Sequence, residues 1–167
     1  MKILIAYYSL TGNTRNLARA MREHFLSKNK NSKISLEEIE PLEKYTYLSA
    51  YSRGCREVVR RILPEIKKPK HDPRKFDLLA VLSPTWAWNS APPVNTYLSL
   101  LPRARKNQKA IAGFTHHSLA RLISDTIANK LKAKGYDVLA SVKIFIQWPI
   151  ASKVSKEDVA RAIGSAG

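Results

Sequence analysis

The chain alternates strand-length segments with segments of helical periodicity along its whole length. Strand patterns span residues 2–8, 34–39, 77–82, 110–114 and 138–146, and helical patterns span residues 14–27, 53–63, 94–101, 119–134 and 157–163. Nearly continuous apolar strands joined by helices predict a parallel sheet with both faces covered. We therefore predict an α/β fold, a doubly wound three-layer αβα sandwich around a five-stranded parallel sheet, in one domain over residues 1–167.

Composition narrows the class of protein. The chain has 167 residues and a single cysteine, Cys55, so no internal disulfide can form. Neither a signal sequence nor an apolar stretch of the ~20 residues that a membrane helix needs is visible, and we expect a reduced, cytoplasmic setting without membrane contact. The formal net charge of +16 is unusual, and one bound phosphate monoester would offset only about two of these charges.

A polar loop between the first strand and the first helix has the composition of a phosphate site. It consists of Ser9, Leu10, Thr11, Gly12, Asn13 and Thr14. Hydroxyl groups, a glycine that permits a tight turn and the free N–H groups of the following helix would converge on one anion there. The alternative is an ordinary strand-to-helix turn capped by Asn13 or Thr14. Phosphate contacts alone bind weakly, so a second, apolar contact region is expected.

Two further loops should lie near this one, because ligands of open parallel sheets bind at the carboxyl ends of the strands. Residues 83–93 follow the third strand and carry two of the three tryptophans without any formal charge. Aromatic side chains at a loop tip suit a flat ring system, although either tryptophan could instead cover the end of the core. The loop after the fourth strand, residues 115–118, is also uncharged.

These motifs resemble the flavodoxin family, in particular its short-chain branch. The resemblance rests on the SxTGxT loop, on Pro-Thr-Trp-Ala-Trp leading to Ala-Pro-Pro-Val, and on residues 51–54 and 63–66, and it covers nearly the whole chain. It implies the strand order 2-1-3-4-5 and non-covalent binding of FMN. By that resemblance the first loop would hold the phosphate, and the isoalloxazine ring would lie against residues of the later loops, with one tryptophan stacked on it: Pro84, Thr85, Trp86, Ala87, Trp88, Asn89, Thr115, His116 and His117.

Two positions depart from the family pattern. His116 and His117 stand where family members commonly have glycines, and Ala87 stands where a glycine often allows a peptide to flip. The histidines could tune the flavin with pH. Equally, they could be plain loop residues, with Ser118 capping the next helix. They lack the companion ligands of a metal site.

Two other phosphate chemistries are disfavoured. The spacing from Cys55 to Arg61 fits a phosphotyrosine-phosphatase loop, but this cysteine lies in a helical pattern and not in an anion loop. A Walker-type loop is excluded because Gly12 is not followed by Lys-Ser or Lys-Thr.

Basic residues follow the predicted helices, at the end of the sheet opposite the flavin. They are Lys28, Lys30, Lys33, Lys67, Lys68, Lys70, Arg74, Lys75, Arg103, Arg105, Lys106, Lys109, Lys130, Lys132 and Lys134. Helix dipoles favour cations at helix C-termini, but this does not explain the excess. We expect a polyanionic partner there, either nucleic acid or an acidic protein.

Three functions are consistent with the sequence. The chain could carry electrons through FMN between redox partner proteins, or it could act as an NAD(P)H-dependent FMN or quinone reductase. It could also be an FMN-free module that binds a polyanion through its basic end.

Overall fold

A five-stranded parallel sheet forms the centre of the molecule in a computed structural model that describes residues 1–117, 122–146 and 153–164. Its order is β2-β1-β3-β5-β6, which is the predicted order once the short hairpin strand β4 is set aside. The bounds are β1 Lys2–Tyr7, β2 Lys33–Glu38, β3 Leu78–Trp86, β4 Asn89–Ser90, β5 Lys109–His116 and β6 Asp137–Phe145. The predicted flavodoxin-like strand order and three-layer architecture are confirmed.

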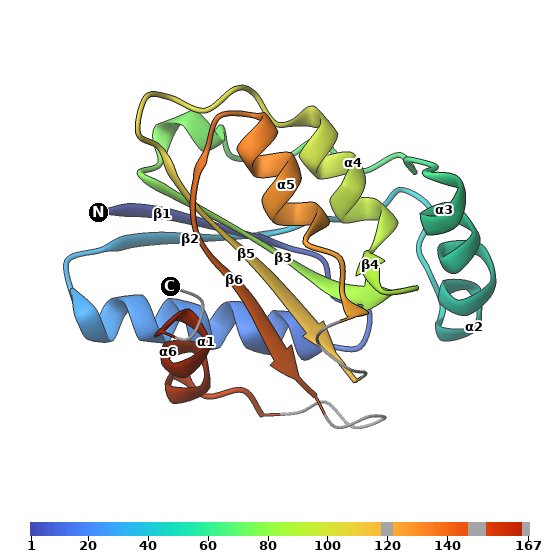
Figure 1. The fold of residues 1–167 in the computed structure, drawn as a ribbon, viewed down its shortest axis with the longest axis horizontal. Coiled ribbons are helices and arrows are strands. Elements are labelled where there is room, and N and C mark those ends of the chain that lie inside the picture. Colours follow the sequence, from blue (N-terminus) through green and yellow to red (C-terminus); the bar gives the residue numbers. More distant parts are fainter. Residues whose placement is uncertain (118–121, 147–152, 165–167) are drawn as a thin grey trace.

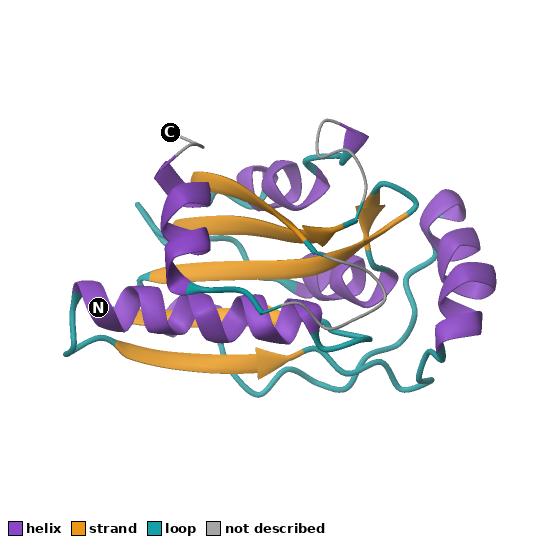
Figure 2. Ribbon diagram, turned by 90° about the horizontal axis from the view of Figure 1, so that it is seen from below, coloured by secondary structure: helices purple, strands orange, loops and turns teal. Residues whose placement is uncertain are grey.

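Helices cover both faces of the sheet (Figures 1 and 2). Helices α1 (Asn13–Lys28) and α6 (Lys156–Gly164) lie on one face, and α4 (Pro92–Leu100) and α5 (Thr126–Ala133) lie on the other. A 3-10 turn, Pro73–Lys75, precedes β3. The remaining helical segment stands beyond the carboxyl end of the sheet, at the right of Figure 1.

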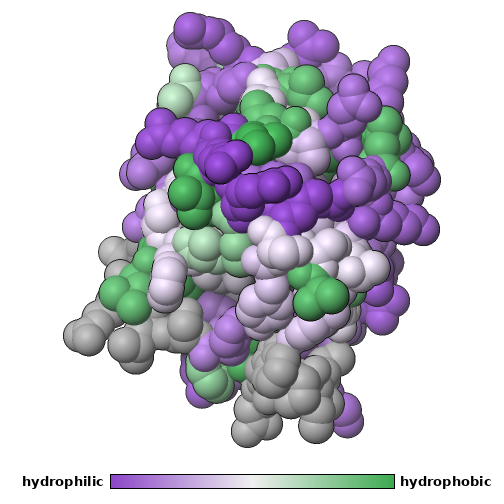
Figure 3. Space-filling view, turned by 90° about the vertical axis from the view of Figure 1, so that its right-hand side faces the viewer, coloured by the Kyte–Doolittle hydropathy of each residue, from purple (hydrophilic) through white to green (hydrophobic). Residues whose placement is uncertain are grey.

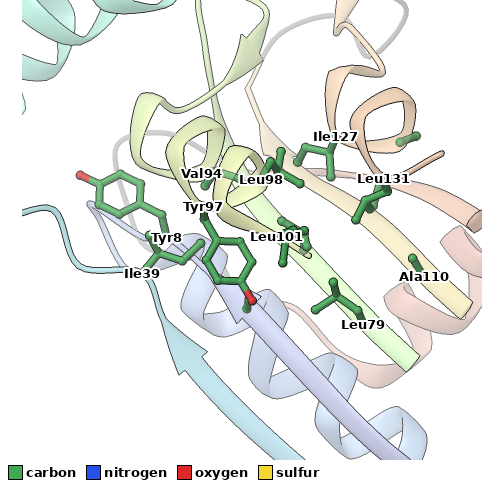
Figure 4. Close-up of a cluster of buried hydrophobic side chains, with 14 of the residues drawn as sticks. Tyr8, Ile39, Leu79, Val94, Tyr97, Leu98, Leu101, Ala110, Ile127 and Leu131 are labelled. Atoms are coloured by element: carbon green, nitrogen blue, oxygen red, sulfur yellow. The ribbon is translucent and has the colours of Figure 1, made fainter. Parts of the chain in front are cut away.

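Side chains that alternate along the central strands build two separate cores. In β1, Ile3 and Ile5 face α1 and α6, whereas Leu4 and Ala6 face α4 and α5, and all four are fully buried. Figure 4 shows the second core, in which residues of α4 and α5 point down onto Leu79 of β3 and its neighbours. Strands that are buried on both faces are the reason for the continuous apolar segments of the sequence.

The helix predicted over residues 53–63 starts earlier and ends earlier. It begins with α2 (Tyr47–Ser49), continues through a π-helical turn (Ala50–Gly54) and ends with α3 (Cys55–Arg60). A capping box starts it, because Thr46 Oγ1 accepts the Ser49 N–H at 3.1 Å and Ser49 Oγ accepts the Thr46 N–H at 2.8 Å. The left-handed Arg61, with φ of 56°, terminates it.

The helix predicted over residues 119–134 is also shorter than expected. It begins at Thr126, because the Ser124 N–H donates to the Trp88 carbonyl at 2.9 Å instead of joining the helix. The predicted cap at Ser118 lies outside the described residues. The helix predicted over residues 157–163 is present as α6, and Ser155 caps it: Ser155 Oγ accepts the Asp158 N–H at 3.1 Å, and the Asp158 carboxylate accepts the Ser155 N–H at 2.9 Å.

Most of the basic residues lie at the amino end of the sheet as predicted, but some do not. Lys67 pairs with Glu40 at 2.6 Å, and Lys70 donates its N–H to Glu37 at 2.5 Å, so the chain from 67 to 70 runs along the carboxyl half of β2. Lys130 donates to Asn95 at 2.9 Å between α5 and α4. Within the described residues, no helix has the length and hydropathy needed to cross a membrane.

Candidate functional site

The first loop gives helix α1 an open N-terminus. Gly12 has φ of 91°, a left-handed conformation that glycine adopts without strain, and no atom lies within 4 Å of where its Cβ would be. Gly12, the N-cap residue, has no side chain with which to cap α1, and the Asn16 N–H makes the helix's first hydrogen bond, to the Gly12 carbonyl at 2.9 Å. The N–H groups that precede it face the loop and add the positive end of the helix dipole.

Hydroxyl groups of this loop are arranged around the helix N-terminus. Thr14 Oγ1 lies 2.9 Å from Thr115 Oγ1, which ties the loop to the end of β5, and Asn13 donates its side-chain N–H to Thr11 Oγ1 at 3.1 Å. Ser9 Oγ is buried and has no hydrogen-bond partner among the described residues. A buried hydroxyl without a partner loses its hydration uncompensated, so it is a natural contact for a polar ligand.

The loop after the third strand is a tight hairpin. Strand β3 extends to Trp86 and pairs with β4 through Thr85 with Ser90 and through Trp86 with Asn89. Both residues of the turn have positive φ, 46° at Ala87 and 59° at the following tryptophan, as in a type I′ turn. Asn, Asp or Gly usually occupies such positions, and each other residue costs roughly 1–2 kcal/mol there. Ala87, which stands where family members often have a glycine, thus adopts the positive φ that glycine would take without this cost, and Trp88 does so as well.

The two tryptophans of this hairpin have different roles. Trp86 packs edge-on against Tyr8, with ring centroids 5.7 Å apart, and against Tyr45 at 5.1 Å. It therefore anchors the hairpin to the core, as in the second interpretation of the sequence. Trp88 is 55% exposed and lies at the cavity rim, where it is available to a flat ligand.

The helical segment from Tyr47 to Arg60 supplies site residues that the sequence analysis did not predict. Tyr47, Ala50, Tyr51 and Cys55 line the same cavity as the hairpin. The two tyrosine rings lie 5.6 Å apart, and burial together with a hydrogen bond to Tyr47 raises the pKa of Tyr51. Tyr47 and Tyr51 are four residues apart and follow the Thr46 capping motif, a spacing that places both side chains on one face of a helix. The sequence could have shown that they share a face, but that face borders a cavity and not the core.

A network of polar side chains holds this segment in place, and Glu43 is its exposed member. The Arg53 guanidinium lies 4.3 Å from the Tyr45 ring centroid, forms an ion pair with Glu43 and approaches Glu57 at 3.6 Å. Glu57 accepts a hydrogen bond from the Tyr45 hydroxyl, and burial is the main cause that raises the pKa of Tyr45. A Cβ on Gly54 would lie only 2.5 Å from the Trp86 ring, so the helix and the hairpin are in close contact.

Of the three site residues predicted in the loop after the fourth predicted strand, two lie at the cavity. Thr115 and His117 line the cavity, and Ile146, which was not predicted, lines it from the end of β6. His116 does not line it: the ring is buried against Phe145 with centroids 5.8 Å apart, and its carbonyl accepts the Ile146 N–H at 2.8 Å. The prediction of a pair of histidines at the ligand therefore reduces to His117.

All three loops and the helical segment enclose one cavity of about 300 Å³. Ten of the fifteen predicted residues line it: Leu10, Thr11, Asn13, Pro84, Thr85, Trp86, Ala87, Trp88, Thr115 and His117. The other five do not line it: Ser9, Gly12 and Thr14 belong to the loop that leads into α1 beside the cavity, Asn89 belongs to the hairpin and His116 ends β5. Asn89, for example, closes the hairpin by accepting the Ser90 N–H at 2.8 Å.

No lysine, arginine, aspartate or glutamate of the described chain lines this cavity. In the space-filling view of this end, pale residues of intermediate hydropathy lie beside green hydrophobic side chains and a purple hydrophilic band (Figure 3). The cavity thus combines aromatic walls, hydroxyl groups and an open helix N-terminus, which suits a flat uncharged ring that carries an anionic group.

Comparison with known proteins identifies the fold. No protein-family model matches the sequence, and no curated protein matches it. Solved structures do match. A Bacteroides eggerthii protein assigned as a flavoprotein has TM-score 0.72 and 18% identity, over 99% of this chain and 97% of that one. A Lactobacillus acidophilus flavoprotein in complex with FMN has TM-score 0.69 and 20% identity, over 96% and 97%. Oxidised flavodoxin 1 of Bacillus cereus has TM-score 0.59 and 14% identity, over 99% and 94%. The chain therefore has the flavodoxin-like fold.

Proposed function

We propose that this chain binds FMN non-covalently in the cavity and carries electrons between redox partner proteins. The observation that carries the proposal is the pairing of an uncharged aromatic cavity with an uncapped helix N-terminus, both at the carboxyl end of a parallel sheet. The similar Lactobacillus flavoprotein, which was crystallised with FMN, supports it. A single cysteine suits work in a reducing compartment such as the cytoplasm.

Polar groups of the site fit FMN at both of its ends. Ser9 Oγ and the N–H groups at the start of α1 would hold the phosphate without a lysine. Thr85 Oγ1 is likewise buried without a hydrogen-bond partner in the described chain, and it lines the ring portion of the cavity. Two unpartnered buried hydroxyls in one site are what a polar ligand would satisfy.

Residues at the opening of the cavity determine how a redox partner would reach the flavin ring. Bound flavin supplies the redox chemistry, and the protein sets its position and surroundings. Trp88, Tyr47 and Tyr51 are 55%, 43% and 56% exposed, so they border the opening and leave the cavity accessible to a partner. Trp88 would stack on the ring, and its carbonyl is fixed by the Ser124 N–H at 2.9 Å.

Titration of the purified protein with FMN and with riboflavin tests the proposal. We expect FMN to be retained at micromolar concentration with quenched fluorescence. Riboflavin, which lacks the phosphate, should bind at least tenfold more weakly, because charge-assisted hydrogen bonds contribute roughly 1.5–3 kcal/mol each. Failure to retain FMN would refute the proposal and leave the FMN-free module. Equal affinities would refute the phosphate site.

A second measurement separates a carrier from a reductase. NADH or NADPH is added without oxygen to the FMN-loaded protein, and the flavin absorbance is followed. A carrier should keep its flavin oxidised until a separate reductase is supplied. Rapid bleaching by the nicotinamide alone would assign the NAD(P)H-dependent reductase activity instead.

A further inference from the structure

The amino end of the sheet carries a cleft whose chemistry is the opposite of the flavin cavity. The cleft measures about 420 Å³ and is lined by Met1, Asn31, Asp77 and five cations: Lys2, Lys33, Arg74, Lys75 and Arg105. These residues come from the starts of β1 and β2, the 3-10 turn before β3 and the loop after α4. Segments far apart in the sequence therefore bring positive charge to one place.

Most of this charge is not neutralised within the fold. Arg74 pairs with Asp72 at 2.9 Å, and Arg105 lies 3.8 Å from Asp77. The side-chain nitrogens of the three lysines of the cleft make no hydrogen bond or ion pair within the described residues, although the charge of Lys75 acts on Asp72 from a distance. Five cations facing one lining carboxylate repel one another at low ionic strength, and an anionic partner would relieve that repulsion.

Helix dipoles do not explain these cations. Lys134 does serve α4, since its Nζ donates to the carbonyls of Ser99 at 3.0 Å and of Leu101 at 2.5 Å. Lys2 and Lys33, by contrast, begin strands, and Arg105 lies five residues beyond Leu100, the last residue of α4. Their positions follow the edge of the sheet and not the ends of helices.

We infer that this basic cleft binds the phosphate backbone of double-stranded nucleic acid, independently of the flavin site. No aromatic side chain of the described residues lines it, so it offers no surface on which unpaired bases could stack. Met1 is its one large apolar lining residue. Protein partners usually engage aromatic anchors, and the most exposed aromatic side chains of the described residues lie at the opposite end of the sheet: Tyr47, Tyr51, Trp88 and Phe145.

The dimensions of the edge agree with this partner. The cations of the cleft lie at the starts of β2 and β1, in the 3-10 turn before β3 and in the loop before β5, and four neighbouring strands about 4.8 Å apart span about 14 Å. A duplex carries one charge per about 1.7 Å of axis, so that length presents roughly 8 phosphates, of which about half face one side. Five cations are enough to contact the phosphates on that side.

Salt dependence of duplex binding tests the inference. The FMN-treated full chain is titrated into two fluorescently labelled 20-base-pair DNA duplexes of unrelated sequence, and anisotropy is followed. Five phosphate contacts predict a slope of log K against log salt of about −4.5, which is roughly a 500-fold loss between 50 and 200 mM salt. Both sequences should bind equally, because phosphate contacts do not specify sequence.

Charge-matched variants show whether the cleft is responsible. Removing its three lysines with K2Q/K33Q/K75Q should reduce the slope to about −1.8 and weaken binding at least tenfold at low salt. The control R56Q/R60Q/K68Q removes the same charge from exposed residues elsewhere and should leave the slope unchanged. Urea unfolding shows that both variants fold.

Several outcomes would overturn the inference. They are no binding at low salt, equal weakening by the control variant, tighter binding of the single strand than of the duplex, or equally effective competition by poly-glutamate. The last result would point to an acidic protein. None of them bears on flavin retention, which is measured on the same preparation.

Discussion

Replacing Gly54 by alanine should loosen the helical wall of the flavin cavity. The new Cβ would lie 2.5 Å from Trp86 Cζ3 and 2.7 Å from Cε3, whereas ordinary contacts begin near 3.4 Å. The indole cannot easily move away, because Tyr8 and Tyr45 hold its other sides with ring centroids 5.7 and 5.1 Å away. The helix must therefore shift by about 1 Å or more, at a cost of roughly 1–3 kcal/mol.

Helix propensity partly offsets that cost. Gly54 has φ of −62° and ψ of −44°, so alanine fits the backbone and gains roughly 0.5–1 kcal/mol. The middle values of the two ranges leave a net destabilisation of about 1 kcal/mol, which lowers the melting temperature by about 2–4 °C in a domain of this size. FMN affinity should fall as well, because Ala50, Tyr51 and Cys55 line the cavity from the same segment.

Urea unfolding followed by tryptophan fluorescence, together with FMN titration, measures both effects. Gly164→Ala is the matched control: this glycine is also helical, and no atom lies within 4 Å of its added Cβ. It should leave stability unchanged or slightly increased and leave FMN affinity unchanged. If Gly54→Ala behaved like its control, the contact between helix and hairpin would not be the constraint described here.

Three further substitutions have distinct expected outcomes. Ser9→Ala removes a hydroxyl without an internal partner, so the free energy of unfolding of the FMN-free protein should change by less than about 0.5 kcal/mol while FMN affinity falls about 10- to 150-fold; unchanged affinity would contradict its phosphate role. Trp86→Ala should destabilise the fold by about 3 kcal/mol in urea, whereas Trp88→Ala should cost little stability but about tenfold in FMN affinity; the reverse pattern would contradict their assigned roles. Burial and the nearby Lys28 charge lower the pKa of His24, so the folded state resists its protonation and loses stability as pH falls through about 6.5. In His24→Gln that loss should be smaller, and urea midpoints of the two proteins that stay parallel between pH 7.5 and 5.5 would refute the assignment.

The strands and their order could be predicted because local pattern and tertiary structure agree. Each central strand is buried on both faces, so a continuous apolar run in the sequence indicates a strand in the middle of the sheet. The first loop was predictable as a tight turn before a helix, because Gly12 and the surrounding hydroxyls favour that conformation directly after a buried strand.

Other parts depend on contacts between distant segments, which a local pattern does not contain. The start of α5 is delayed by the hydrogen bond from Ser124 to the hairpin, 36 residues earlier in the chain. The sequence did not predict that α2 and the π-helical turn line the cavity, because Tyr47 and Tyr51 are about half exposed and do not pack in the hydrophobic core. The positive φ of Trp88 was unexpected because the sequence places a bulky residue where turn chemistry favours Asn or Gly.

The polarity of the repeated strand–helix unit explains why the two proposed sites differ so strongly in charge. In a parallel sheet every strand ends at the same edge. Helix α1, which follows the loop after β1, begins at that edge with N–H groups that have no partner within the helix and favour an anion. That edge can therefore hold a phosphate without lysines, and added cations would only draw competing anions into an apolar cavity. At the other edge helices end and strands begin, so lysines are tolerated or favoured and can accumulate. Strand β1 alone separates the two edges by about 20 Å, more than twice the screening length of about 8 Å at physiological salt. A polyanion on the basic cleft would thus leave the electrostatics of the flavin cavity nearly unchanged.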